Sequence, residues 1–304
     1  MKAVKFGGTS MATVESIRTV RNIILSDSER RFVVVSAPGK ALGAKKVTDM
    51  LIEVHKAEPS KRGEAFSAVK ARFAALIKGL ELRENLLDKE FAEIEAKLPH
   101  ASYDYVVSRG EYLCAKLLAE YVGYEFVDAE GLVYFRDGSH YDDERTEMCC
   151  EHGLKGHNRV VVPGFYGSDG NGNIVTFSRG GSDISGAIVA RAVGASVYEN
   201  FTDVDGFMTC DPRCVPHAAL LDILTYDELR ELAYMGANVL HPESIFPVRK
   251  ANIPIHILNT FNECSIGTKI VPTDDFLAGR YADTSGVRVG HFLFGLGINL
   301  LQPL

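Results

Sequence analysis

The residues best suited to chemistry lie at the start of the chain, in the segment Lys5-Phe6-Gly7-Gly8-Thr9-Ser10. Apolar residues 3–6 predict a short buried strand, and the glycine pair after it lets the backbone turn sharply and approach a ligand closely. Thr9-Ser10 are helix-capping types, and residues 11–24 have the apolar spacing of a helix. A helix N-terminus presents N–H groups and a positive dipole end to an anion, which the Lys5 ammonium can also reach. The segment therefore indicates a phosphate site, although many strand–glycine–helix turns bind nothing.

A second glycine turn has the same layout in the other half of the chain. Arg179-Gly180-Gly181-Ser182-Asp183 follows a predicted strand over residues 174–177 and opens a predicted helix over residues 184–190. The guanidinium of Arg179 is a rigid fork that suits a carboxylate, and a structural arginine is the alternative interpretation. Two such turns suggest sites for two anions, or for the two ends of one substrate arrangement.

Three carboxylates follow predicted elements and are candidate ligand contacts. Glu111 comes after Ser108-Arg109-Gly110, at a predicted loop–helix junction, where it could accept a substrate ammonium or simply interact with the helix dipole. Asp203 and Asp205 follow a predicted strand over residues 196–201. They could hold ribose, a metal ion or a cationic neighbour, and the alternative is ordinary turn chemistry at the glycine that follows them.

The composition limits the classes of partner. The 304 residues carry a net charge of −7, with 46% hydrophobic and 24% charged residues, as in ordinary soluble globular proteins. The mild acidity argues against nucleic acid or an anionic membrane as the main partner, because such binders usually carry a basic face. No apolar run reaches the roughly 18 residues of a spanning helix, and no signal-peptide pattern opens the chain. The six cysteines lack disulfide-framework and zinc-site spacing, so we expect free thiols, a cytoplasmic location and no metal site built by the protein.

Short apolar strands alternate with helices along the chain. This alternation predicts an α/β fold with a mostly parallel sheet covered by helices on both faces. In such sheets ligands bind at the carboxyl ends of the strands, where each polar loop named above would lie. Residues 61–98 are charged with helical apolar spacing, and predict two amphipathic helices with solvated outer faces. Further strands are predicted over residues 31–36, 126–132, 159–162 and 253–258, the last of the core strands, and further helices over residues 48–55, 113–121, 226–234 and 245–251.

Seven segments together resemble the aspartokinases, within the amino acid kinase fold. They are Lys5-Phe6-Gly7-Gly8-Thr9-Ser10, Ser108-Arg109-Gly110-Glu111, Arg179-Gly180-Gly181-Ser182-Asp183, Thr202-Asp203-Val204-Asp205-Gly206, Asp211-Pro212-Arg213, Val239-Leu240-His241-Pro242 and Gly267-Thr268-Lys269-Ile270. The segments stand in the family's order over residues 1–272. The resemblance implies a three-layer αβα sandwich with a mostly parallel central sheet. It also implies a catalytic domain over residues 1–272, whose N-terminal part binds aspartate and whose later part, from about residue 200, binds nucleotide.

The resemblance implies an ATP-dependent aspartate kinase that makes 4-phospho-L-aspartate, the first step towards lysine, threonine and methionine. ATP would enter with Mg²⁺, and the protein would form a homodimer. Arg179 would bind the α-carboxylate of aspartate, and Glu111 would bind its α-ammonium. The implied site residues are Lys5 and Asp183 in catalysis, with Asp183 orienting Lys5 or its neighbours; Thr48, Glu111, Arg179, Gly180, Gly181 and Ser182 for aspartate; and Lys5, Gly7, Gly8, Thr202, Asp203, Met208, Arg213, Asn238 and Val239 for nucleotide.

The sequence departs from the family pattern in three places. Gly236-Ala237-Asn238 stands where the family usually has Gly-Ala-Lys, so the positive charge that would contact ATP phosphates is replaced by an amide. Met208 replaces a tyrosine common in the nucleotide site. Residues 273–304 are too few for the regulatory ACT domains of relatives, so we expect a short tail and no feedback inhibition through such domains. An alternative interpretation is a weakly active or inactive paralogue that binds aspartate or nucleotide and acts through assembly with a partner.

Overall fold

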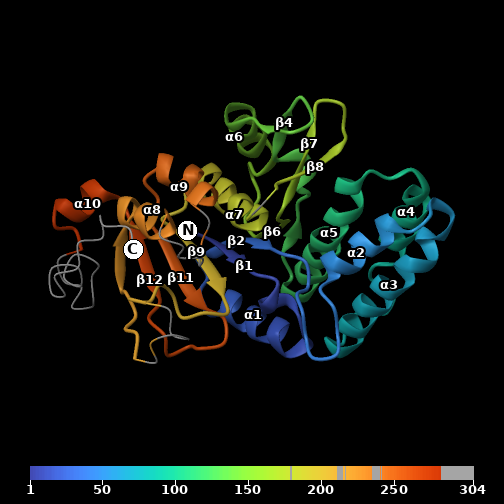
Figure 1. Ribbon diagram of the computed structural model, residues 1–304, viewed down its shortest axis with the longest axis horizontal. Coiled ribbons are helices and arrows are strands. Elements are labelled where there is room, and N and C mark those ends of the chain that lie inside the picture. Colours follow the sequence, from blue (N-terminus) through green and yellow to red (C-terminus); the bar gives the residue numbers. More distant parts are fainter. Residues whose placement is uncertain (179, 211–214, 216, 235–239, 241, 282–304) are drawn as a thin grey trace.

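The computed structural model describes residues 1–178, 180–210, 215, 217–234, 240 and 242–281. Its centre is an eight-stranded sheet (Figure 1). From one edge to the other, the strands are β10 (Ile223–Thr225), β12 (Thr268–Val271), β11 (Ile255–Asn259), β9 (Val197–Thr202), β1 (Lys2–Phe6), β2 (Arg30–Val35), β6 (Val160–Pro163) and β3 (Glu125–Phe126). Neighbouring strands are parallel except β11 and β12, which are antiparallel. The predicted mostly parallel α/β sheet is therefore confirmed.

Helices connect the strands and cover both faces of the sheet. The α-helices of the described residues are α1 (Val14–Ser26), α2 (Val47–Lys56), α3 (Arg62–Gly79), α4 (Asp88–Lys97), α5 (Tyr103–Val122), α6 (Asp143–Gly153), α7 (Gly181–Ala192), α8 (Tyr226–Tyr234), α9 (Phe246–Lys250) and α10 (Thr273–Leu277). Single 3₁₀ turns are η1 (Thr9–Met11), η2 (Pro59–Lys61), η3 (Leu98–His100), η4 (Ala129–Gly131) and η5 (Pro242–Ile245). In Figure 1, α7 and α9 lie above the sheet and α1 lies below it.

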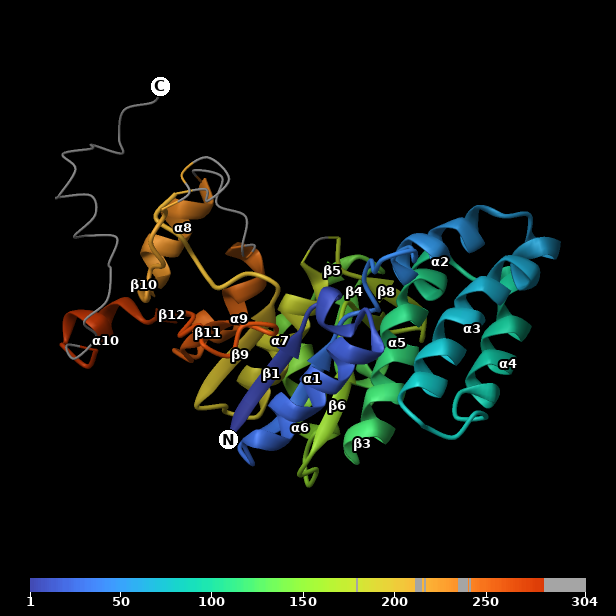
Figure 2. The ribbon, with the colours of Figure 1, turned by 90° about the horizontal axis from the view of Figure 1, so that it is seen from below.

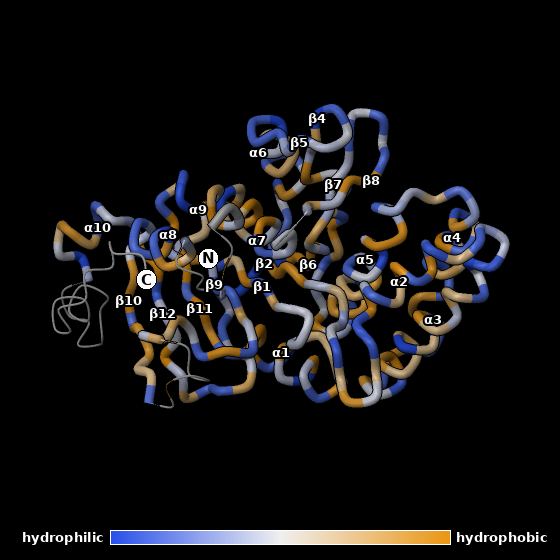
Figure 3. The backbone as a smooth tube through the Cα atoms, in the orientation of Figure 1, coloured by the Kyte–Doolittle hydropathy of each residue, from blue (hydrophilic) through white to orange (hydrophobic). Residues whose placement is uncertain are grey.

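Two hydrophobic cores fill the space on the two faces. Alternate residues of β1 divide between them, because successive side chains of a strand point to opposite faces. Val4 packs with α1 and α5 in one core, whereas Ala3 packs with Tyr198 and α7 in the other. Figure 3 shows the apolar segments concentrated in the central strands and the hydrophilic ones in the outer turns. Strands buried on both faces explain the continuous apolar runs in the sequence.

The two predicted amphipathic helices are confirmed as α3 and α4. They form a hairpin that extends beyond α2, on the side of the molecule away from β10 and β12 (Figure 2). Phe66, Val69 and Phe73 of α3 are buried, and most charged side chains of the pair face outward. Lys116 of α5 pairs with Glu90 of α4 at 2.7 Å, which ties the hairpin to the rest of the structure.

A second, four-stranded sheet stands above the first in Figure 1. Its order is β5 (His140–Tyr141), β4 (Tyr134–Arg136), β7 (Tyr166–Asp169) and β8 (Ile174–Thr176). The predicted strand over residues 174–177 is confirmed as β8, but β4, β5, β7, β10 and β12 were not predicted. Strands of two to four residues contain too few alternations to stand out from loops. The predicted strand over residues 126–132 is wrong beyond Phe126, because the chain turns into η4 there.

The start of the first helix also differs from the prediction. Thr9-Ser10 lie in the η1 turn and do not cap α1. Thr13 caps it instead, since its side chain accepts a hydrogen bond from the Ser16 N–H at 3.1 Å while the Ser16 hydroxyl accepts one from the Thr13 N–H at 2.9 Å. This reciprocal capping box places the helix N-terminus several residues beyond Gly8.

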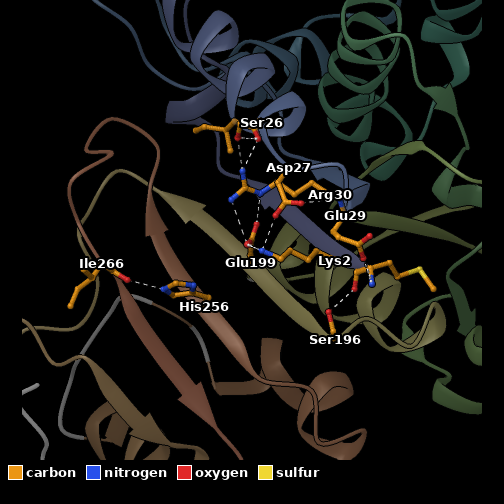
Figure 4. A network of polar contacts seen from close by, with 11 residues as sticks. Lys2, Ser26, Asp27, Glu29, Arg30, Ser196, Glu199, His256 and Ile266 are labelled. Carbon is orange, nitrogen blue, oxygen red and sulfur yellow. Dashed lines mark hydrogen bonds and ion pairs between the residues drawn. The ribbon is translucent and has the colours of Figure 1, made fainter. Parts of the chain in front are cut away.

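A buried ionic network closes the amino ends of three central strands (Figure 4). Glu199 of β9 is 2% exposed, and its carboxylate contacts Lys2 Nζ at 2.8 Å and Arg30 Nε at 2.6 Å. Lys2 also reaches Asp27 at 2.9 Å, and the Arg30 guanidinium lies over the Phe201 ring. The network thereby fixes β1 and β2 to β9 at the end of the sheet where these strands begin.

We expect Glu199→Gln to lower the free energy of unfolding by about 2 kcal/mol, because a neutral amide leaves two part-buried cations without their counter-charge. Urea denaturation measures the change. Glu95→Gln is the control, since the Lys70–Glu95 pair at 2.6 Å is about one-third exposed and should contribute under about 1 kcal/mol. Equal losses in the two variants would contradict a structural role for the buried network.

Candidate active site

Lys5 lies at the centre of the main sheet and holds an ion pair with α7. Its side chain is 7% exposed, and Nζ lies 2.7 Å from Oδ1 of Asp183 in the first turn of α7. Asn200, the partner of Lys5 in the β1–β9 register, contacts both groups. The contact between Lys5 and Asp183 is the one that the resemblance implied, whereas Asn200 was not predicted as a site residue.

The first glycine turn is held by close backbone packing. Gly39 donates its N–H to the Gly8 carbonyl at 2.8 Å, and a Cβ on Gly39 would lie 2.6 Å from the Gly8 carbonyl carbon. Only glycine therefore fits at position 39. The N–H of Gly7 donates to the Phe201 carbonyl at 3.2 Å, so the predicted use of this amide for a phosphate is not supported by its geometry. The N–H of Gly8 has no acceptor among the described residues.

Side chains after the first turn tie it to the carboxyl ends of β9 and β11. The Thr9 hydroxyl donates to Asp203 Oδ2 at 3.0 Å, and Thr202 donates to Oδ1 of the same carboxylate at 3.4 Å. Ser10 and Thr260 share a hydrogen bond of 2.7 Å between their hydroxyls. These contacts bring the first glycine turn and the predicted nucleotide residues Thr202 and Asp203 to one edge of the sheet.

Asp205 and Met208 belong to the loops beside this edge. Asp205 Oδ1 accepts hydrogen bonds from the amides of Asn259 at 2.8 Å and Asn262 at 3.0 Å. Its contacts therefore join this loop to the end of β11 and to the segment that follows it. Met208 forms an isolated antiparallel bridge with Leu220. Of the predicted nucleotide residues, Arg213, Asn238 and Val239 lie outside the described residues.

The second glycine turn needs both of its glycines. Gly180 caps α7 with φ of 57°, a left-handed conformation that glycine adopts without strain. A Cβ on Gly181 would lie 2.7 Å from the Phe165 ring. Ser182 packs against Gly164, where a Cβ would meet it at 2.8 Å. The turn and the N-terminus of α7 are thus pressed onto the carboxyl end of β6, and Arg179 itself lies outside the described residues.

Phe165 was missed by the sequence analysis. It has φ of 79°, which is a strained conformation for a side chain with a Cβ. Its N–H donates to the Ser185 hydroxyl at 3.0 Å, and its carbonyl accepts from the Phe177 N–H at 2.9 Å. These bonds from α7 and from the segment after β8 hold the strained residue directly below Gly181. No periodicity in the sequence signals such a conformation.

Glu111 lies in the middle of α5, so the predicted loop–helix junction is wrong. Gly110 lets the helix pack closely against Ala37, because a Cβ at position 110 would lie only 2.8 Å from the Cβ of Ala37. The Glu111 side chain is 5% exposed, and its Oε2 has no hydrogen-bond partner among the described residues. Burial raises the pKa of Glu111 to about 8, against the opposing effects of the Ala37 N–H and the Arg109 charge. A buried carboxyl with one oxygen free of described partners is suited to receive a cation.

Arg109, two residues before Glu111, places its guanidinium among three tyrosine rings. Its guanidinium lies 4.5 Å from the ring centroid of Tyr105, 4.7 Å from that of Tyr112 and 5.1 Å from that of Tyr166. It also donates to the Ser108 hydroxyl at 3.0 Å. Cation–π contacts of this kind hold a positive charge in a buried place without a carboxylate partner.

Thr48 lies at the start of α2, next to Val47, which contacts the Gly110 position. Glu111 and Ser182 lie near the carboxyl ends of β2 and β6, because their segments pack against Ala37 and Gly164, the residues that follow these strands. A cleft of about 710 Å³, a volume in the usual range for small-molecule sites, adjoins the second glycine turn and is lined there by Phe177, Ser178 and Ile184. Lys5, Glu111 and Asp183 are not among the described residues that line it.

Among the residues with described positions, no cluster of three or more histidine, cysteine or acidic side chains could hold a metal ion. Within the same part of the chain, no helix is both long and apolar enough to cross a bilayer. The five described cysteines are free thiols.

Comparison with known proteins gives the family of the chain. The model of the amino acid kinase family matches residues 1–259. The chain belongs to the amino acid kinase family. Within this family it is 37% identical to aspartokinase 3 of Bacillus subtilis, over 90% of this chain and 64% of that protein. It thus spans less than two thirds of the length of that relative.

Solved structures agree on the fold of this amino acid kinase. The crystal structure of Clostridium acetobutylicum aspartate kinase superposes with a TM-score of 0.84 and 38% identity, covering 90% of this chain and 64% of the other. Escherichia coli aspartokinase III in complex with aspartate and ADP superposes with a TM-score of 0.78 and 28% identity over the same shares. The predicted resemblance to the aspartokinases is confirmed.

Proposed function

We propose that the chain is an aspartate kinase, which transfers the γ-phosphoryl group of ATP to the side-chain carboxylate of L-aspartate. The observation that carries the proposal is the pairing of two features at one edge of the sheet. Lys5 supplies a fixed ammonium beside the first glycine turn, and Glu111 supplies a buried carboxyl whose Oε2 has no partner among the described residues. The phosphates of a nucleotide need the ammonium of Lys5, and the α-ammonium of an amino acid needs the carboxylate of Glu111. The E. coli relative whose complex holds aspartate and ADP supports the same reading.

The reaction requires the protein mainly to position the two substrates and to supply positive charge. A carboxylate is already deprotonated at neutral pH, so the acceptor needs no general base. The carboxylate oxygen attacks the γ-phosphorus as the bond to the β,γ-bridging oxygen breaks, and ADP leaves with the electron pair of that bond. The products are an acyl phosphate and ADP. The protein has to hold two anions in line and to neutralise the transferring group, which is the task we assign to Lys5.

Aspartate is recognised at its two ends in this account. The α-ammonium binds the carboxylate of Glu111, and the α-carboxylate binds Arg179 with help from the turn of Gly180 and Gly181. Ser182 and Thr48 add hydrogen bonds. The left-handed Gly180 and the free N–H groups at the start of α7 favour an anion here, because among the described residues the N–H groups of Gly181 and Ser182 have no acceptor.

The nucleotide lies across the ends of β9 and β11. Gly8, Thr202 and Asp203 line this edge through the contacts of the first turn. Met208 provides an apolar wall, and we assign Arg213, Asn238 and Val239 to the same site from the resemblance. Gly7 lies beside Lys5, since the position of a Cβ there is 3.6 Å from Lys5 Nζ, an ordinary van der Waals distance.

The donor set fits Mg²⁺ that arrives with ATP. Asp183 and Asp203 are single carboxylates already engaged by Lys5 and Thr9, and no larger acidic cluster occurs among the described residues. Such a site would hold Mg²⁺ mainly through substrate phosphates and water, and Asp183 or Asp203 would supply a protein carboxylate. The ion, when bound, neutralises charge on the phosphates. We further propose a cytoplasmic homodimer acting in the first step towards lysine, threonine and methionine.

Aspartate-dependent release of ADP tests the proposal. With Mg²⁺-ATP we expect turnover with L-aspartate at least tenfold faster than with L-glutamate, since the longer side chain would place its carboxylate out of line. Steady ATP consumption independent of any amino acid, or a preference for glutamate, would refute the assignment. Binding of aspartate and nucleotide without turnover would instead support the paralogue interpretation.

Asn238 supplies a separate prediction about nucleotide binding. We expect Asn238→Lys to lower KM for ATP by roughly tenfold, because it restores a charge-assisted contact to phosphate. KM for aspartate should not change. An unchanged KM for ATP would mean that another cation already serves the phosphates in place of the missing lysine.

A further inference from the structure

Asn200 occupies a buried position between the two charged groups of the site. It lies in β9 directly beside Lys5 of β1, in the parallel register of the two strands, and is 3% exposed. Its Oδ1 accepts from Lys5 Nζ at 3.4 Å, and its Nδ2 donates to Asp183 Oδ1 at 2.8 Å. Asn200 thus contacts both members of the 2.7 Å ion pair, which joins residues far apart in the sequence.

An amide suits this position for a chemical reason. It offers an acceptor and a donor on one short planar group, so it can meet an ammonium and a carboxylate together without adding charge. Asp183 Oδ1 consequently receives two donors, one from Lys5 and one from Asn200. A carboxylate held in this way cannot turn to engage the ammonium with both of its oxygens.

The helix that supplies Asp183 is itself fixed on β9. The Tyr198 hydroxyl donates to the Asp183 carbonyl at 3.2 Å. Gly186 lets α7 approach this tyrosine, since a Cβ there would lie 2.3 Å from the Tyr198 hydroxyl oxygen. Tyr198 thus holds the backbone of Asp183 and Asn200 holds its side chain, so the position of the carboxylate that pairs with Lys5 is fixed.

The Lys5 ammonium has three N–H donors, of which Asp183 and Asn200 take two. Nζ lies beside Gly7, where the absence of a Cβ leaves the approach open. We propose that Asn200 is a positioning residue for the reaction, which holds Lys5 and Asp183 so that the third donor of Lys5 faces the phosphates. The proposal rests on the proposed function, because it takes Lys5 to be the phosphate contact.

Glu199 provides a matched control one residue away. It lies on the same strand but points to the opposite face, into the ionic network of Lys2 and Arg30 (Figure 4). The two neighbours should therefore separate stability from catalysis. Glu199→Gln should lower the unfolding temperature and leave the kinetics unchanged. An Asn200 variant should lower kcat and leave the unfolding temperature almost unchanged.

The test compares Asn200→Leu and Asn200→Asp with Glu199→Gln, using kcat, KM, the unfolding midpoint and the affinity for ADP by calorimetry. Asn200→Leu has similar volume and removes both hydrogen bonds. We expect its kcat to fall roughly 10- to 100-fold and its ADP affinity at least about fivefold, with KM for aspartate within about twofold. Its midpoint should stay within about 3 °C of the wild type. Asn200→Asp should lose at least as much kcat, because a second carboxylate competes for Lys5.

An unchanged kcat in Asn200→Leu overturns the proposal, as does a fall in kcat that accompanies a lower unfolding midpoint. ADP affinity separates this result from the fate of the proposed function. If the wild type does not phosphorylate aspartate, yet Asn200→Leu binds ADP at least fivefold more weakly than wild type and Glu199→Gln, the positioning role stands and the substrate assignment fails. Equal ADP affinity in all of these proteins removes the positioning role.

Discussion

Lys5→Met is expected to lower kcat by about 10³-fold or more. Methionine keeps the length and most of the volume of lysine, but it removes the charge that neutralises the transferring phosphoryl group. Loss of one preorganised donor at such a position costs roughly 10²- to 10³-fold, and loss of a full cation at a phosphoryl group reaches 10³- to 10⁵-fold. Initial rates with saturating ATP and aspartate measure the change.

KM for aspartate should stay within about threefold in Lys5→Met, since Lys5 serves the phosphates. A double-mutant cycle with Asp183→Asn gives the control, because the two groups form one ion pair of 2.7 Å. We expect the double variant to be little worse than the worse single variant, as for groups that act as a unit. Additive losses, or a Lys5→Met enzyme with near-normal kcat, would contradict the assigned role.

Glu111→Gln is expected to raise KM for aspartate by roughly 10²-fold with a smaller effect on kcat. The buried carboxylate and the substrate ammonium form a charge pair that the amide cannot reproduce, and removing one partner of such a pair costs about 2–5 kcal/mol. Steady-state kinetics with varied aspartate give the value. Glu90→Gln is the matched control, because Glu90 is also buried but pairs with Lys116 on the α4 side of the fold. An equal rise in KM for both variants would indicate a general disturbance.

The raised pKa of Glu111 gives the same variant a pH signature. With a pKa of about 8 in the empty site, the carboxyl is mostly protonated at pH 7 and has to release its proton to bind an ammonium. KM for aspartate should therefore fall by up to about tenfold per pH unit as the pH rises from 6.5 to 8, and then level off. Glu111→Gln should lack this slope. A wild-type KM that is flat across this range would contradict the raised pKa.

The free energy of unfolding should fall as the pH rises, whereas the affinity for aspartate should rise. The native pKa of Glu111 lies above the ordinary value of 4.5 for a glutamate, so the folded protein binds more protons than the unfolded chain between pH 4.5 and about 8. The favourable contribution is complete below pH 4.5 and is lost as the pH rises to 8. Relative to Glu111→Gln, the wild type should therefore lose stability between pH 5 and pH 9 in urea denaturation.

The sequence predicts most of the central sheet and the two glycine turns, because both depend on local patterns. Short apolar runs locate β1 and β9, and the glycine pairs locate the turn after β1 and the start of α7. The position of Glu111 could not be predicted in this way. Gly110 weakens a helix on propensity, yet α5 continues through it because the glycine lets the helix pack closely against Ala37.

Asn200 shows a second limit of prediction from sequence. An amide in an apolar strand has no distinctive spacing, and its importance comes from Lys5 and Asp183, which the fold brings to it from distant parts of the chain. The strained backbone of Phe165 and the close contact of Gly39 with Gly8 likewise arise only in tertiary packing. Supporting residues of this kind carry no local signal in the sequence.

The most direct test of the proposed reaction is to trap its product with hydroxylamine. An acyl phosphate on the side-chain carboxylate reacts to give the β-hydroxamate of aspartate, whereas transfer to the α-carboxylate would give the α-hydroxamate. With Mg²⁺-ATP and L-aspartate, we predict one β-hydroxamate for each ADP released, with formation abolished in Lys5→Met. ADP release without hydroxamate, or an α-hydroxamate as the product, would contradict the account.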